Sequence, residues 1–217
     1  MAFDELAGTA NGVTVARGRT GLVTQNAPRY RRAISPLQAA AMARMDVAGS
    51  AWEGLSEESV AEWRRYARSI VRTGDVSGKK YNPLAFNVFS GLFCKLLQID
   101  PSAAVPEWPP SAPMPLDRIG VAVSVTPEGV LYVASRANLP GMLTELFVQK
   151  LPGRHRVPRP KSNSAGFRAF TDADRTFALP VAPGTYFCAC AVVEAGTGRS
   201  SRVMPIGTLH VPDSAGV

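Results

Sequence analysis

The chain has 217 residues, of which 46% are hydrophobic and 19% are charged, and its formal net charge is +7. These proportions are ordinary for a globular protein of one large or two small domains, and they exclude disorder along the whole chain. The positive charge favours polyanions such as nucleic acid as partners. Because the basic residues are spread along the sequence, the charge permits that function without identifying it.

Residues 1–7 lack the basic start and the long apolar run of a secretory signal peptide. No stretch of the sequence approaches the ~18 consecutive apolar residues of a membrane-spanning helix. We therefore expect synthesis in the cytoplasm and no membrane partner.

Residues 1–34 predict an extended basic arm or a loose hairpin, because glycine recurs there and apolar positions are few. Its basic residues and one tyrosine are candidate interface residues that contact a neighbouring subunit: Arg17, Arg19, Arg29, Tyr30, Arg31 and Arg32. The same arginines suit a phosphate backbone, and a solvated arm that is ordered only by a partner is a third interpretation.

Residues 35–99 predict a module of three helices. Ser35 followed by Pro36 is typical of a helix start, and we expect this helix to run from Pro36 to about Ala48. Its alanines and methionines are small or adaptable, so the next helix is expected to approach it closely.

A central helix is expected within residues 51–70, where Trp52 and Trp63 share a buried face and Ser56 is a suitable N-cap. Arginines gather toward its C-terminal end. The candidate nucleic-acid contacts are Arg64, Arg65 and Arg68, with Lys79 and Lys80 in the following turn. Residues 74–80 fail the spacing of a phosphate-binding loop, so we expect no nucleotide cofactor there.

Asn82-Pro83 repeats the helix-start signal for a third helix that is apolar almost all round. Such a helix needs cover on several sides. Phe89 and Phe93 are therefore candidate interface residues for a neighbouring subunit.

Six prolines make residues 100–118 an extended linker, and Trp108 is expected to pin it to one of the domains. From residue 119 onward, apolar residues alternate with polar ones in short runs separated by turn residues. The six runs are 121–125, 130–134, 143–148, 176–181, 186–193 and 203–211. Residues 119–212 thus predict an antiparallel β-sandwich, followed by a tail at 213–217. The predicted fold class is α+β in two domains.

The C-terminal half carries a Pro-Gly turn at 183–184, Tyr186 at the start of a late strand, and a Gly- and Ser-containing turn at 196–201. This order resembles fibronectin type III and related immunoglobulin-like modules over roughly the last hundred residues. The resemblance implies a sandwich and no particular function, since this fold serves binding, spacing and scaffolding alike. The tryptophan usual in the second strand is replaced by the region 131–133.

The helical half is similar to uncharacterised proteins of bacteria and their phages. The residues that carry this resemblance are Ser35-Pro-x-Gln38, Arg44, Trp52-x-x-Leu55, Trp63, Asn82 and Phe86. It implies a packing module rather than an active site. A structural role follows where such proteins occur beside virion genes.

We do not expect an enzyme. The chain has two histidines, His155 and His210, and it lacks the Gly-x-Ser-x-Gly, His-Glu-x-x-His and paired Cys-x-x-Cys motifs. No catalytic, cofactor-binding or metal-binding residue is predicted, and no cofactor. Cys94, Cys188 and Cys190 are expected to be reduced core thiols, since an odd number suggests no disulfide framework.

The leading hypothesis is a non-enzymatic structural or assembly protein, a repeated subunit or accessory component of a phage-type virion or similar particle. Its expected partners are further copies of itself or a capsid- or tail-type scaffold, with weak, non-specific nucleic-acid binding. The alternatives are a nucleic-acid-binding protein that uses the basic arm and the central helix, and an adhesive module that binds a host surface.

Overall fold

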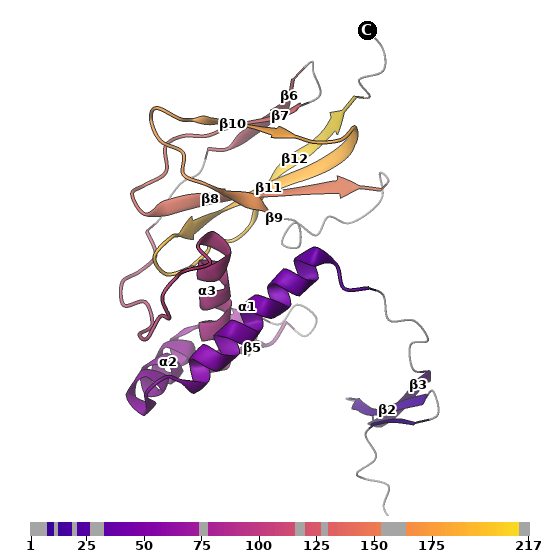
Figure 1. Ribbon diagram of the computed structural model, residues 1–217, viewed down its shortest axis with the longest axis vertical. Coiled ribbons are helices and arrows are strands. Elements are labelled where there is room, and N and C mark those ends of the chain that lie inside the picture. Colours follow the sequence, from indigo (N-terminus) through magenta and orange to yellow (C-terminus); the bar gives the residue numbers. More distant parts are fainter. Residues whose placement is uncertain are drawn as a thin grey trace, which may run out of the picture. The chain divides into compact units, whose positions relative to one another are not determined.

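Figure 1 shows the computed structural model of the chain, which describes residues 8–10, 13–18, 21–26, 33–73, 78–115, 120–126, 130–152 and 164–212. The described residues form three helices and four antiparallel sheets. The α+β class predicted from the sequence is therefore confirmed. The chain divides into two compact units, Met1–Met42 and Ala43–Val217.

The first unit contains a small antiparallel sheet in the order β1-β2-β3. Its strands are β1 (Gly8–Ala10), β2 (Val13–Gly18) and β3 (Gly21–Asn26). Gly18 pairs with Gly21 at the turn between β2 and β3. Strands this short and this few lie at the limit of independent stability.

Helix α1 (Pro36–Glu53) begins in the first unit with a reciprocal cap. The Ser35 hydroxyl accepts a hydrogen bond from the backbone N–H of Gln38 at 3.2 Å, and the Gln38 side-chain oxygen accepts one from the N–H of Ser35 at 3.0 Å. This capping box satisfies two donors that a helix N-terminus would otherwise leave unpaired. The predicted start is confirmed, but α1 continues past Ala48 to Glu53.

Because α1 continues to Glu53, Trp52 lies on α1 and not on the central helix predicted for it. Helix α2 (Glu57–Ser69) starts after a break, with the Ser56 hydroxyl accepting from the Ser59 N–H at 3.1 Å, as predicted for this N-cap. The two tryptophans meet through α3. The rings of Trp52 and Trp63 each lie 5.3 Å from the ring of Phe89.

Helix α3 (Ala85–Ile99) supplies most of the helical core. The exposed fraction of Phe89 is 0% and that of Phe93 is 1%, because α1, α2 and α3 enclose them together. A neighbouring subunit reaches these two rings only if the helices separate. Phe89 and Phe93, predicted as candidate interface residues, are therefore core residues of this module.

Asn82 does not cap α3, whose N-cap is Leu84. The Asn82 side-chain amide donates to the carbonyl oxygens of Arg68 and Ile70, both at 2.8 Å. These carbonyls end α2, where backbone acceptors lack helical partners. Asn82 thereby fastens the short hairpin of β4 (Arg72–Thr73) and β5 (Lys80–Tyr81) to the end of α2.

Trp63 holds the linker to the helices, because its indole N–H donates to the carbonyl oxygen of Glu107 at 3.2 Å. Trp108, which was predicted to hold the linker to one of the domains, is half exposed and lines a hollow with Ala51 and Leu55.

Two antiparallel sheets make up the C-terminal half. One has the order β10-β7-β6 and the other the order β12-β11-β8-β9. Their strands are β6 (Ala122–Val125), β7 (Val130–Ala134), β8 (Met142–Leu151), β9 (Ser164–Arg168), β10 (Thr176–Pro180), β11 (Gly184–Glu194) and β12 (Met204–Val211). The six strands predicted from alternation are confirmed, and β9 is an additional one.

Residues from both sheets share the same hydrophobic clusters. One cluster joins Leu131 of β7 to Tyr186 and Cys188 of β11, and a second joins Val133 to Leu146 and Cys190. The opposite face of β11 is also covered, since Ala189 and Ala191 pack with Phe147 of β8. Burial on both faces explains why β11 is apolar almost without interruption.

Candidate interaction surfaces

Within the described ranges, no three His, Cys, Asp or Glu side chains lie together as ligands of a metal ion would. None of the helices described is long and apolar enough to cross a bilayer. Three features stand out instead: an uncovered apolar helix surface, a cluster of basic side chains, and a buried charge pair between helices and sheet.

The apolar stretch of α1, residues 36–42, is exposed along its whole length. Its apolar side chains are those of Pro36, Leu37, three alanines and Met42, with Gln38 as the polar exception. An open groove of about 590 Å³ lies along it, lined by Ala33, Ile34, Gln38, Ala41 and Met42. The sequence predicted close packing of the next helix along this stretch, whereas all its residues are exposed.

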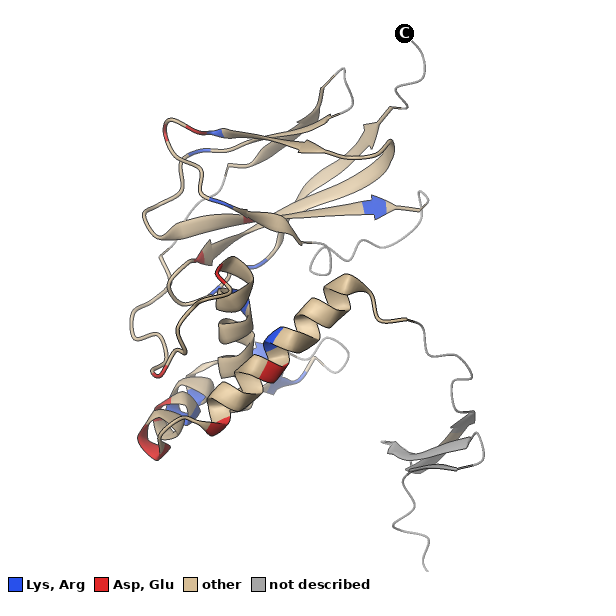
Figure 2. Cartoon of the chain, viewed as in Figure 1, with Lys and Arg blue, Asp and Glu red and all other residues tan. Residues whose placement is uncertain are grey.

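The basic face combines the second half of α2 with the hairpin that follows. Its six cationic side chains are all exposed: Arg64, Arg65, Arg68, Arg72, Lys79 and Lys80. Figure 2 shows basic positions along α2 and the hairpin, and acidic ones where α2 begins. The five residues predicted as nucleic-acid contacts are thus neighbours in the fold, joined by Arg72.

The side of α2 that lies away from the basic face is buried in the helical core. Trp63 and Ala67 of α2 point into the helical core, so the arginines between them emerge from the opposite side of the helix. The carboxylate of Glu62 makes an ion pair with Arg65. Tyr81, on β5, is half exposed and pairs across the hairpin with Arg72.

A charge pair joins α3 directly to the four-stranded sheet. The Lys95 ammonium lies 2.8 and 2.9 Å from the two carboxylate oxygens of Glu145 on β8. The side chain of Glu145 is 1% exposed and that of Lys95 21%. The ammonium also lies over the ring of Phe167 on β9, 5.3 Å from its centre. Helices and sheets are therefore in contact, in addition to their connection through the linker.

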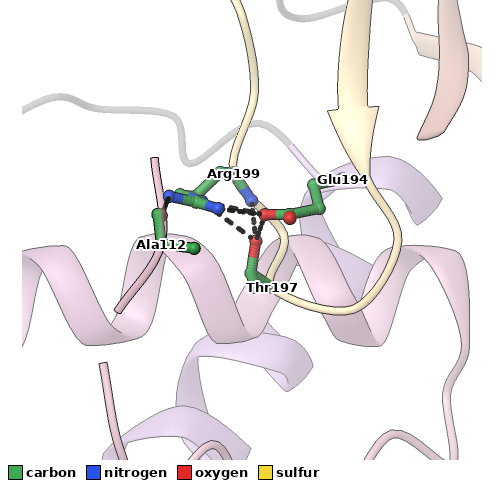
Figure 3. Close-up of polar contacts among 4 residues, drawn as sticks. All are labelled: Ala112, Glu194, Thr197 and Arg199. Carbon is green, nitrogen blue, oxygen red and sulfur yellow. Dashed lines mark hydrogen bonds and ion pairs between the residues drawn. The ribbon is translucent and has the colours of Figure 1, made fainter. Parts of the chain in front are cut away.

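A second polar cluster lies beside this pair (Figure 3). Arg199 makes an ion pair with Glu194 at 2.7 Å and donates to the carbonyl oxygen of Ala112 in the linker. Thr197 donates to the same Glu194 carboxylate. A hollow of about 380 Å³ opens between α3 and this turn, and it reaches Lys95 and Arg199. Lys95 and Arg199 are already paired with carboxylates, and Arg72 of β4 is a third cation that lines the hollow.

The three cysteines are free. Burial raises the pKa of Cys188 and of Cys190 to about 11. Partial burial also raises the pKa of Cys94, with the charge of Arg44 acting in the opposite direction, and the Cys94 sulfur lies 3.5 Å from that of Met45. Cys188 and Cys190 are the buried core thiols that were expected, and Cys94 is partly buried against the helical core.

Several predicted residues cannot be placed in a site. Those outside the described residues are Arg19, Arg29, Tyr30, Arg31, Arg32 and His155. Arg17 is placed by its backbone on β2, opposite Leu22. His210 lies on β12, with a ring nitrogen 3.4 Å from the Thr185 hydroxyl.

The sequence interpretation missed the exposure of α1 and the pair between Lys95 and Glu145. The first has a signal, since residues 33–43 contain no charged residue and a helix covered by its own chain usually shows a charged outer face. The pair between Lys95 and Glu145 has no signal in the sequence, because fifty positions separate the two residues.

No protein-family model matches the chain, and no curated protein or solved structure matches it.

Proposed function

We propose that the chain is a non-enzymatic structural subunit that associates with further copies of itself through the apolar stretch of α1, as a repeated or accessory component of a phage-type virion or similar particle. The observation that carries this proposal is the exposure of residues 36–42, with 71% of Leu37 open to solvent. Burial of apolar surface contributes roughly 25 cal/mol per Å², so an uncovered helix of this kind gains from a partner.

A second copy is the occupant that suits this surface. Residues 33–43 contain no charged side chain, so a symmetry-related copy brings no like charge against its own. Leu37, Ala40 and Ala41, at positions i, i+3 and i+4, share one face of α1. The two alanines are short enough to let a second helix approach closely, and Leu37 fills space between the two helices. A twofold contact of this kind uses the same patch on both subunits.

The small sheet that precedes α1 fits the same role. Strands β1, β2 and β3 comprise fifteen residues in all, three, six and six, too few to bury much surface without a partner. We propose that this arm, with its candidate contacts Arg17, Arg19 and Arg29–Arg32, lies on a neighbouring subunit. Phe89 and Phe93 are not part of this proposal, because they belong to the helical core.

We further propose that the two C-terminal sheets form a fibronectin-type sandwich that braces or projects the subunit. Two observations support this. The strand orders β10-β7-β6 and β12-β11-β8-β9 place the first, second and fifth strands in one sheet and the others in the second. The Tyr186 hydroxyl at the start of β11 donates to the carbonyl of Ala182 upstream, as in the tyrosine corner of such folds.

A pair of matched variants tests the self-association. Leu37 and Leu84 are equally exposed, at 71% and 72%, and each stands at a helix N-terminus. Leu37→Glu and Leu84→Glu therefore make the same chemical change in similar places. A glutamate in the first turn of α1 also favours the helix, so Leu37→Glu does not act by unfolding it.

We expect the wild-type protein and Leu84→Glu to sediment as oligomers and Leu37→Glu as a monomer with the same helical content by circular dichroism. The wild-type oligomer should persist in high salt, because apolar contacts are not screened. A wild-type protein that sediments as a monomer at every concentration contradicts the proposal. So does a Leu37→Glu variant that assembles as the wild type does.

A further inference from the structure

We infer that the basic face of α2 and the β4–β5 hairpin binds the phosphodiester backbone of nucleic acid, with Tyr81 as a platform on which a base stacks. The inference is independent of self-association, because the basic face and the apolar stretch of α1 consist of different residues. Six exposed cations, Arg64, Arg65, Arg68, Arg72, Lys79 and Lys80, meet there.

The helix dipole accounts for only part of this clustering. Glu57 and Glu58 in the first turn of α2, and Arg68 in the last, are where a helix is stabilised by such charges. Arg72, Lys79 and Lys80 lie beyond the end of the helix and gain nothing from its dipole. The basic surface thus continues from the end of α2 onto the hairpin.

Among the residues that the structure describes, the acidic side chains near α2 neutralise only part of the basic face. Glu62 pairs with Arg65, but that arginine is three-quarters exposed, and such surface pairs contribute only about 0–1 kcal/mol, so a phosphate can displace it. Arg64, Arg68 and Lys80 make no ion pair with any residue that the structure describes. These cations are available to phosphates without the loss of a stronger contact.

The two elements that carry the basic face, α2 and the hairpin, are attached to the rest of the helical module. Arg64 and Arg68 stand one helical turn apart, about 6 Å along the axis, on a helix whose opposite side is buried through Trp63. Asn82, next to β5, links the hairpin to the helix by donating to the carbonyl oxygens of Arg68 and Ile70 at the end of α2. The backbone positions of Arg64 and Arg68 are therefore set by the core, and binding has to order only their side chains.

Tyr81 points to single strands as the preferred ligand. Its side chain is 50% exposed on β5, and its cross-strand partner Arg72 lies on the same face of the hairpin. A half-exposed aromatic ring beside a cation is an arrangement with which proteins stack unpaired bases while holding the backbone, without reading sequence. In a duplex the bases are already stacked, so Tyr81 has nothing to add.

The test measures fluorescence anisotropy of labelled oligothymidine, and of a duplex, between about 50 and 200 mM salt. Six phosphate contacts predict a slope of log K against log salt of about −4 for the single strand and about −5 for the duplex. The variant carrying Arg64→Ala, Arg65→Ala and Arg68→Ala should roughly halve both slopes. Alanine keeps α2 helical, so folding is retained.

A control variant carries Arg136→Ala, Arg175→Ala and Arg202→Ala, three exposed arginines outside the basic face. It has the same net charge as the first variant and should keep the wild-type slopes. Tyr81→Ala should weaken single-strand binding about tenfold, as stacking of one base is worth roughly 1–3 kcal/mol, and leave duplex binding unchanged.

Equal losses in the two triple variants would mean that only net charge matters, and would overturn the inference. It is also overturned if the wild type fails to bind oligothymidine at the lowest salt. A third contrary result is that the α2 variant changes sedimentation but not nucleic-acid affinity, since the basic face is then a protein contact. Nucleic-acid binding can be measured even if the protein does not self-associate, because fluorescence anisotropy also detects binding by a monomer.

Discussion

Lys95→Met removes the one charge that neutralises the most deeply buried carboxylate described in the fold. Lys95 donates to both oxygens of Glu145 at 2.8 and 2.9 Å, and to the side-chain oxygen of Gln98 at 3.1 Å. Methionine keeps most of the apolar stem and its contact with the sheet. The change therefore isolates the charge, leaving a carboxylate that is 1% exposed without a cation.

Breaking a buried pair from one side costs about 3–5 kcal/mol, against a total of roughly 5–15 kcal/mol for a folded domain. Glu145→Gln should cost less, about 1–3 kcal/mol, because Lys95 is partly exposed and can turn to water and Gln98. The double variant Lys95→Met with Glu145→Met removes both charges, and it should recover most of the loss.

Urea unfolding followed by far-ultraviolet circular dichroism gives the free energies of unfolding. The order of stability should be wild type and double variant first, Glu145→Gln next and Lys95→Met last. A loss below about 1 kcal/mol for Lys95→Met, as for an exposed pair, would refute the reasoning, since Glu145 would then be solvated and the seam between α3 and the sheet open.

Two further changes probe the core. Trp63→Ala should lower the free energy of unfolding, measured in urea, by on the order of 3–5 kcal/mol because of the cavity it leaves. It should also lower the unfolding midpoint of the near-ultraviolet signal of the sheets, because α3 contacts β8. An unchanged midpoint would mean that Trp63 does not support this core. In the native protein near neutral pH, a thiol reagent should modify at most Cys94, because burial raises the pKa of Cys188 and Cys190 to about 11, and all three thiols should react in denaturant; two or more fast-reacting thiols in the native protein would contradict this packing.

Local patterns were enough to predict the three helices and, in the C-terminal half, six strands. Alternation of apolar and polar residues predicted six strands, and the hydroxyl of Ser56 predicted the start of α2. Strand β9 was not predicted, because Gly166 interrupts the short alternation of apolar and polar residues there. Its pairing with β8 is also irregular, with a shift of one residue after Leu146. These signals are local in the sequence, which is why they survive in the fold.

Longer-range choices could not be predicted in the same way. Asn82 has the form of a helix cap, yet its amide serves the end of α2, where two unpaired carbonyls compete for it. The apolar surface of α3 gives no indication of whether its own chain or a neighbour covers it, so Phe89 and Phe93 were expected at an interface and lie in the core. The opposite error was made for α1, whose apolar residues were expected inside.

The apolar stretch of α1 is tested most directly by hydrogen exchange of its backbone amides as a function of protein concentration. Residues 37–42 are exposed among the residues that the structure describes, so an isolated copy should exchange their amides fast, by local opening of the helix. If a second copy covers them, exchange should slow markedly as concentration rises, in the wild type and in Leu84→Glu but not in Leu37→Glu. Exchange at the same fast rate at every concentration would contradict self-association through α1.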